Sequence, residues 1–138
     1  MNNDRLFKKT SIESLFTNDQ PTNVFEEFKY IIYLSIHCIR CINILGEFEN
    51  HQDLEFDSNM CILIDCDESE ILLIEKLYKI PIPIFCLAYH KKYVKYLQNF
   101  TPPHLIDTSN FPNLAGNKIN SFKEINCIIL NSRILPLS

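Results

Sequence analysis

Short apolar runs alternate with amphipathic segments along the second half of the chain. Residues 60–65 (MCILID) and 82–89 (IPIFCLAY) carry nearly unbroken apolar side chains, which is typical of strands covered on both faces. Residues 104–107 (HLID) predict a third, brief strand. The remaining segments repeat apolar residues at helical spacing, which predicts helices after Asp67, over 91–100 and over 121–133.

Capping patterns and prolines mark the ends of these helices. The patterns are D-x-x-E at 67–70 and S-x-x-E at 121–124, which are typical of helix N-termini. Pro81 ends the first helix and Pro102 ends the second. The isoleucine-rich run 126–130 also allows a strand in place of part of the last helix.

The first half of the chain is more ambiguous. Residues 1–22 form a polar arm, and 29–36 (KYIIYLSI) is rich in β-branched and aromatic residues, which favours a strand. The same apolar positions also fit one long helix over 24–48. We favour a strand over 29–36 followed by a helix over 37–48.

The alternation of strands and helices predicts the fold class. An alternating order implies a parallel sheet with helices on both faces. We therefore expect an α/β fold, a three-layer αβα arrangement with a mostly parallel sheet of four to five strands. It would form a single domain over 23–138, preceded by the arm 1–22.

Glycine is scarce, with only Gly46 and Gly116 among 138 residues. Phosphate-binding loops and nucleophile turns need glycine where backbone approaches a ligand closely or turns at positive φ. The chain therefore contains no GxGxxG, P-loop or GxSxG motif, and no cofactor is expected. The 20 Ile and 14 Asn against 2 Ala indicate an AT-rich genome.

Charge and hydropathy limit the partners. The net charge is -4, and the densest basic cluster, residues 91–95, covers about one helical turn, less than a nucleic-acid surface needs. The apolar-rich stretch 30–45 is interrupted and too short to cross a bilayer. We expect neither nucleic acid nor a membrane span. The opening MNNDRLFKKT lacks the apolar core of a secretory signal, which favours an intracellular, reducing compartment, cytoplasmic or organellar.

The six cysteines supply the sharpest candidate chemistry. His37, Cys38 and Cys41 belong to HCIRC, and a CxxC motif can act as a redox pair or as half of a zinc site. No second CxxC follows, so reduced cysteines that pack as small apolar residues are the favoured interpretation. Cys61 and Cys66 frame a strand-like ILID, whose alternation would point their sulfurs to opposite faces.

Polar residues follow the expected strands at the edge where α/β proteins bind ligands. In a parallel sheet this edge would collect the segments 64–67, 87–90 and 106–109. Asp65 and Asp67 could together hold Mg²⁺, although a helix cap at Asp67 and a solvated strand end at Asp65 are favoured. His90 could act as a base or ligand, but a surface histidine is favoured.

The stretch 60–133 resembles the second half of a response-regulator receiver domain. In that family a strand ends in the phospho-accepting aspartate, as 60–65 ends in Asp65 here. The next strand follows proline and ends in a hydroxyl–alanine pair, an outline seen in PIPIFCLAYH. The resemblance implies a flavodoxin-like fold and phospho-acceptance at Asp65 with Mg²⁺. The chain departs from the family at three places: Ala88 stands where the family has the hydroxyl residue, Thr108 where it has the lysine, and residues 35–37 where it has the acidic pair. A relative with these departures would be a pseudo-receiver.

These observations together favour a non-catalytic protein-interaction domain over an enzyme. It would be a pseudo-receiver adaptor in signalling or a small subunit of a larger complex, and its partner would be another protein or a second copy of this chain. Its candidate partner-binding residues are Tyr89, His90, Tyr93, Tyr96 and Phe111. Two alternatives stay open: a phospho-acceptor that uses Asp65 with Asp67, and a small metal or redox protein that uses Cys38 and Cys41.

Overall fold

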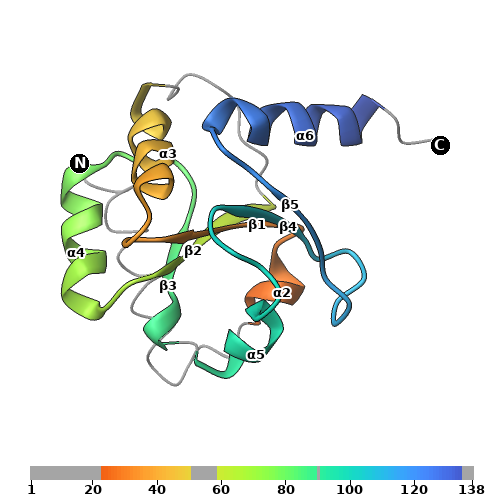
Figure 1. Ribbon diagram of the computed structural model, residues 1–138, viewed down its shortest axis with the longest axis horizontal. Helices are drawn as coiled ribbons and strands as arrows, with labels where there is room; N and C mark the ends of the chain where they lie inside the picture. The colour runs from red at the N-terminus through yellow and green to blue at the C-terminus, as the bar shows by residue number, and fades with distance from the viewer. Residues whose placement is uncertain (1–22, 51–58, 90, 135–138) are drawn as a thin grey trace.

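A five-stranded sheet organises the chain, of which the computed structural model describes residues 23–50, 59–89 and 91–134 (Figure 1). In sheet order the strands are β3 (Ile84–Cys86), β2 (Met60–Asp65), β1 (Tyr30–Ser35), β4 (His104–Asp107) and β5 (Ala115–Lys118). The helices are α2 (Val24–Glu27), α3 (Ile39–Asn50), α4 (Glu68–Leu77), α5 (Val94–Leu97) and α6 (Phe122–Ile134), with 3₁₀ turns η1 (Leu87–Tyr89) and η2 (Lys91–Tyr93). The predicted α/β class is confirmed. The expected arm 1–22 lies outside the described residues.

The sheet is mixed, which departs from the mostly parallel sheet expected from the sequence. Strands β1, β2 and β3 are parallel, whereas β4 runs antiparallel to β1 and β5 antiparallel to β4. The reason lies in the connection from β3 to β4. His104, the first residue of β4, faces Tyr33 near the end of β1, so the chain leaves β3 and enters β4 at the same edge of the sheet. A parallel β4 would need a crossover that carries the chain back to the other edge, usually along a helix, whereas the helical pieces between β3 and β4 are η1, η2 and α5, with 3, 3 and 4 residues.

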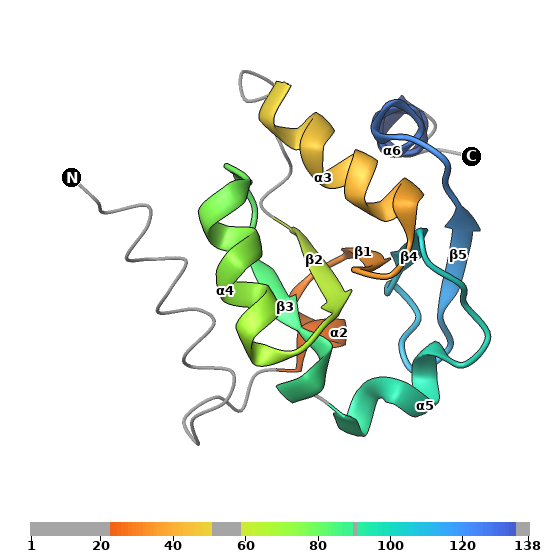
Figure 2. The ribbon, with the colours of Figure 1, turned by 60° about the vertical axis from the view of Figure 1, so that its left-hand side comes forward.

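Both faces of the sheet are covered. Alternate residues of β1 point to opposite faces: Ile32 and Leu34 join a core cluster with α3, α4 and α6, whereas Ile31 and Tyr33 join a second cluster with α2 and α5. Figures 1 and 2 show α3, α4 and α6 on one side of the sheet and α2 and α5 on the other. The unbroken apolar strands of the sequence are therefore explained by burial on two faces.

The ambiguous region 24–48 resolves into a short helix, a strand and a helix. Strand β1 ends at Ser35, whose hydroxyl accepts from the backbone N–H of His37 at 3.2 Å and whose carbonyl accepts from that of Cys38 at 3.2 Å. This turn separates β1 from α3, so the strand-then-helix prediction is confirmed and the single long helix is wrong. Helix α2 was not predicted.

Other boundaries differ from the predictions in ways that the local structure explains. The capping box of Asp67 and Glu70 starts α4 as predicted, and α6 is helical throughout, so the alternative strand at 126–130 is wrong. The predicted strand 82–89 is shortened to β3, and the helix 91–100 to η2 and α5. The predicted loop 111–120 contains β5, whose four residues are all exposed and so carry no apolar alternation.

Candidate functional site

The carboxyl ends of β1 and β2 lie side by side and form the edge where ligand chemistry was expected. Ser35 faces Asp65 in the register, and the backbone N–H of Ile36 donates to the carbonyl of Asp65 at 3.2 Å. From this edge β1 continues into the CxxC motif and β2 into the cap of α4. The sequence-predicted residues of these two segments are therefore brought to one end of the molecule.

The CxxC cysteines differ sharply in their surroundings. Cys38 directly precedes α3 and is partly exposed, whereas Cys41 lies in the first turn and is buried. The backbone N–H of Cys41 donates to Cys38 Sγ at 3.3 Å, so the outer sulfur occupies the N-cap position of the 12-residue helix. The motif thus presents one sulfur to solvent and holds the other behind it.

The ionisation of the two thiols differs in the same direction. Burial by itself raises the pKa of Cys38, but hydrogen bonds from the Cys41 thiol and from backbone N–H groups outweigh it, so the pKa falls below its ordinary value. The pKa of Cys41 is raised to about 12, first by burial and then by the hydrogen bond that its proton makes to Cys38. The arrangement favours a thiolate at Cys38 and a protonated thiol at Cys41.

Residues at the end of β5 add positive charge beside the motif. The charge of Lys118 further lowers the pKa of Cys38, and its Nζ donates to the carbonyls of Thr101 and Pro102 at 3.3 and 3.2 Å. Those carbonyls belong to the segment that leads into β4, where the Pro102-Pro103 peptide is cis. Arg40, inside the motif, donates to Asn120 Oδ1 at 2.8 Å. The backbone carbonyls of Thr101 and Pro102 therefore hold the Lys118 ammonium near the motif.

The two predicted carboxylates take different places. The carboxylate of Asp67 accepts from Glu70 N–H at 2.9 Å and from Ser69 Oγ at 2.8 Å, and these bonds, the first above all, lower its pKa. Asp65 is exposed at the end of β2. Within the described ranges, no group of three His, Cys, Asp or Glu side chains could hold a metal ion. Asp67 is thus the predicted helix cap, and phospho-acceptance at Asp65 stays a prediction.

The third segment expected at this edge lies elsewhere. Because β4 is antiparallel to β1, its last residue, Asp107, faces the first residue of β1, Tyr30. The segment 106–109 is therefore at the amino edge of β1, and its expected meeting with Asp65 is wrong. The hydroxyl of Thr108 donates to the carbonyl of Phe28, and the carbonyl of Lys29 lies 3.1 Å from the same hydroxyl. Thr108 therefore connects the segment before β1 to the residue that follows β4.

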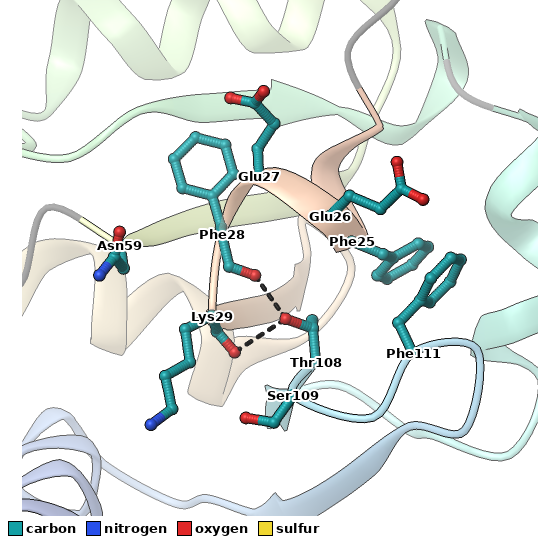
Figure 3. A pocket seen from close by; sticks show the side chains of 9 residues that line it. All are labelled: Phe25, Glu26, Glu27, Phe28, Lys29, Asn59, Thr108, Ser109 and Phe111. Carbon is teal, nitrogen blue, oxygen red and sulfur yellow. Dashed lines mark hydrogen bonds between the residues drawn. The ribbon is translucent and has the colours of Figure 1, made fainter.

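An open depression of about 470 Å³ lies at this amino edge (Figure 3). Phe25 and Phe111 stack at its side with centroids 5.3 Å apart, and the Thr108 hydroxyl points at the backbone, as the dashed lines show. The sequence did not single out this depression, since it depends on the reversed direction of β4. Its lining residues are Phe25, Glu26, Glu27, Phe28, Lys29, Asn59, Thr108, Ser109 and Phe111.

The aromatic residues predicted to bind a partner pack mostly inward. Tyr93 is buried against Phe25, with centroids 5.0 Å apart, and Tyr96 and Phe111 are half-buried with centroids 5.2 Å apart. These three rings belong to or pack on the cluster under α2 and α5. The side chain of Tyr89 and all of His90 lie outside the described residues. A partner-binding role for this set stays a prediction.

Comparison with protein-family models, with curated proteins and with solved structures finds no match to this chain. The helices of the described ranges are all too short or too polar to cross a lipid bilayer.

Proposed function

We propose that the protein carries out thiol–disulfide exchange through Cys38 and Cys41. The single observation that carries the proposal is the asymmetry of the pair: a partly exposed sulfur at the N-cap of α3 with a lowered pKa, and a buried thiol in the next turn with a pKa of about 12. A CxxC motif between a strand and a helix, with a low-pKa outer cysteine, is the arrangement of thioredoxin-type redox proteins.

The asymmetry supports a two-step exchange. The Cys38 thiolate attacks one sulfur of a disulfide, which forms a mixed disulfide and releases a thiolate. Cys41 then gives up its proton, and its sulfur attacks Cys38 Sγ, which releases the second thiolate and closes a Cys38–Cys41 disulfide. The released thiolates take up the available protons, and two electrons pass from the protein to the substrate.

The helix and Lys118 support the first step in particular. A thiolate at a helix N-terminus is stabilised by the backbone N–H groups and the helix dipole, and a nearby ammonium adds to this. Cys61 offers the contrast within the same chain, since burial alone raises its pKa well above the ordinary value. A cysteine that only filled the core would behave like Cys61.

Trapping tests the proposal. The reduced full chain is incubated with oxidised glutathione, quenched with acid, alkylated and mapped by mass spectrometry. Cys41→Ser is expected to accumulate a glutathione adduct at Cys38, whereas the wild type resolves it to a Cys38–Cys41 disulfide. Cys127→Ser, which removes an exposed thiol on α6, is the matched control and should behave like the wild type. An adduct that persists on wild-type Cys38, or forms only on Cys127, contradicts the proposal.

A protein-interaction domain is the second candidate, and one face of α4 supports it. Ile71 and Ile74 bury one side of this helix, while Leu72, Leu73 and Leu77 on the other are 55, 53 and 58 % exposed. Adjacent exposed leucines are typical of surfaces that bind other proteins. Sedimentation of the full chain over a range of concentrations tests whether the partner is a second copy: self-association that Leu73→Glu abolishes supports it. A strict monomer rules out the second copy.

A further inference from the structure

A second pair of cysteines lies at the carboxyl edge of the sheet, on neighbouring strands. Cys66 directly follows β2 and Cys86 ends β3, and their sulfurs are 3.7 Å apart. The Cys86 thiol also donates to the carbonyl of Cys66 at 2.9 Å. Both residues belong to the core cluster beneath α3 and α4, with exposed fractions of 6 and 1 %.

We infer that Cys66 and Cys86 are a second oxidation site, where an intramolecular disulfide forms between the ends of β2 and β3. The sulfurs must close by roughly 1.7 Å to reach a disulfide length of about 2.0 Å. In the strand register Cys86 pairs with Ile64, two residues before Cys66, so the two cysteines lie diagonally across the ends of β2 and β3, and both side chains enter the same core cluster. Cys66 directly follows β2, so rotation of both side chains and a small shift of the backbone at Cys66 can supply the closure while β2 and β3 stay paired.

A peroxide is an oxidant small enough to reach this buried pair. The Cys66 sulfur, the more exposed of the two, attacks the peroxide oxygen and becomes a sulfenic acid, and the leaving oxygen departs as water or an alcohol. The Cys86 sulfur then displaces the sulfenic hydroxyl, which leaves as water with the thiol proton. The two thiols lose two electrons and two hydrogens, and the peroxide O–O bond is cleaved.

The pair should react more slowly than Cys38. The hydrogen bond to Cys86, followed by burial, raises the pKa of Cys66, so little thiolate is present at neutral pH. Reaction then depends on local opening, and β3 is suited to open because it is an edge strand of 3 residues. The disulfide would tie this edge strand and α4 to β2 and raise the melting temperature.

Cysteine mapping of the full chain after hydrogen peroxide treatment tests the inference. The Cys38→Ser/Cys41→Ser double variant removes the proposed exchange pair, so the outcome does not depend on that function, and the wild type is mapped alongside in case the variant misfolds. The exposed Cys127 thiol is the reference for the extent of oxidation, because it is directly accessible to peroxide. Cys61 is the matched internal control, because it is equally buried on β2 but lies in the other core cluster, which contains no second cysteine.

The expected result is a linked pair of peptides containing Cys66 and Cys86, with a mass loss of about 2 Da that dithiothreitol reverses, while Cys61 stays a free thiol. The oxidised form should melt several degrees higher. If Cys66 and Cys86 are both still free thiols once Cys127 is fully oxidised, or if Cys66 links to another cysteine, the inference is overturned.

Discussion

The two glycines offer a matched test of the packing around β4 and β5. A Cβ at Gly116 would lie 2.7 Å from His104 Cδ2 and 2.9 Å from Phe100 Cε1, both shorter than side chains tolerate. Other contacts hold these two rings in position. They meet edge to face with centroids 4.9 Å apart, and His104 Nδ1 is 3.2 Å from the carbonyl of Thr101. At Gly46, inside α3, nothing lies within 4 Å of the added atom.

The expected effects therefore have opposite signs. Overpacking costs about 1–3 kcal/mol, and the reduced freedom of the unfolded chain returns roughly 0.4–1 kcal/mol, so Gly116→Ala should destabilise by up to about 2.6 kcal/mol, or about 1.3 kcal/mol at the centre of both ranges. Gly46→Ala should stabilise by about 0.5–1 kcal/mol because alanine is the better helix former. Urea unfolding of both variants beside the wild type measures the difference. A Gly116→Ala protein more stable than the wild type, like the Gly46→Ala protein, would refute the described contact between β5 and the two rings.

Three further predictions follow from described contacts. Thr108→Val should lower the free energy of unfolding by about 1–2 kcal/mol, since it removes the hydroxyl that donates to the Phe28 carbonyl, whereas the Lys29 carbonyl keeps the backbone N–H of Thr108 at 2.9 Å. Thr108→Ser should stay near the wild type in the same urea series. Phe48→Ala should cost about 3–5 kcal/mol, because its ring is fully buried edge to face against Phe122 of α6; a loss below 1 kcal/mol would contradict that packing. Burial lowers the pKa of His104 below 6.5, so the stability that its neutral form contributes is present above pH 6.5 and is lost as the pH falls through the lowered value. His104→Asn should flatten this acid-side loss of stability in unfolding curves measured from pH 7 to 5, and an unchanged slope would count against it.

The elements built on strong local patterns could be predicted from the sequence. The apolar run of β2 predicts the bounds of that strand, and the capping box of Asp67 and Glu70 predicts the start of α4, which ends at Leu77, before the stop predicted from Pro81. The limits of β4 were also predicted correctly. These patterns are local: burial on both faces requires consecutive apolar residues, and a capping box requires two residues three positions apart.

The direction of β4 and the presence of β5 could not be predicted in this way. The apolar pattern of a buried strand is the same whether its neighbour is parallel or antiparallel, so the segment HLID does not predict the direction of β4. Strand β5 has four exposed residues and is defined by its backbone pairing with β4. These two features decide that Thr108 lies at the amino edge and Lys118 beside the CxxC motif.

The candidate site was found only in part. The sequence singled out Cys38 and Cys41 by their spacing, but their difference in burial depends on how α3 packs against the sheet. The contact between Cys66 and Cys86 joins residues 20 positions apart and follows from the pairing of β2 with β3. The sequence prediction that Cys61 and Cys66 point to opposite faces is confirmed, since they belong to different core clusters.

A redox titration of the Cys38–Cys41 pair tests the central claim most directly. The full chain is equilibrated in glutathione buffers of graded ratio, quenched with acid, alkylated and mapped residue by residue. The proposed exchange function predicts that Cys38 and Cys41 convert together and reversibly between dithiol and disulfide, with a midpoint between about -270 and -120 mV, the range that CxxC oxidoreductases span. Two thiols that stay reduced across the whole series, or that oxidise independently of one another, would contradict it.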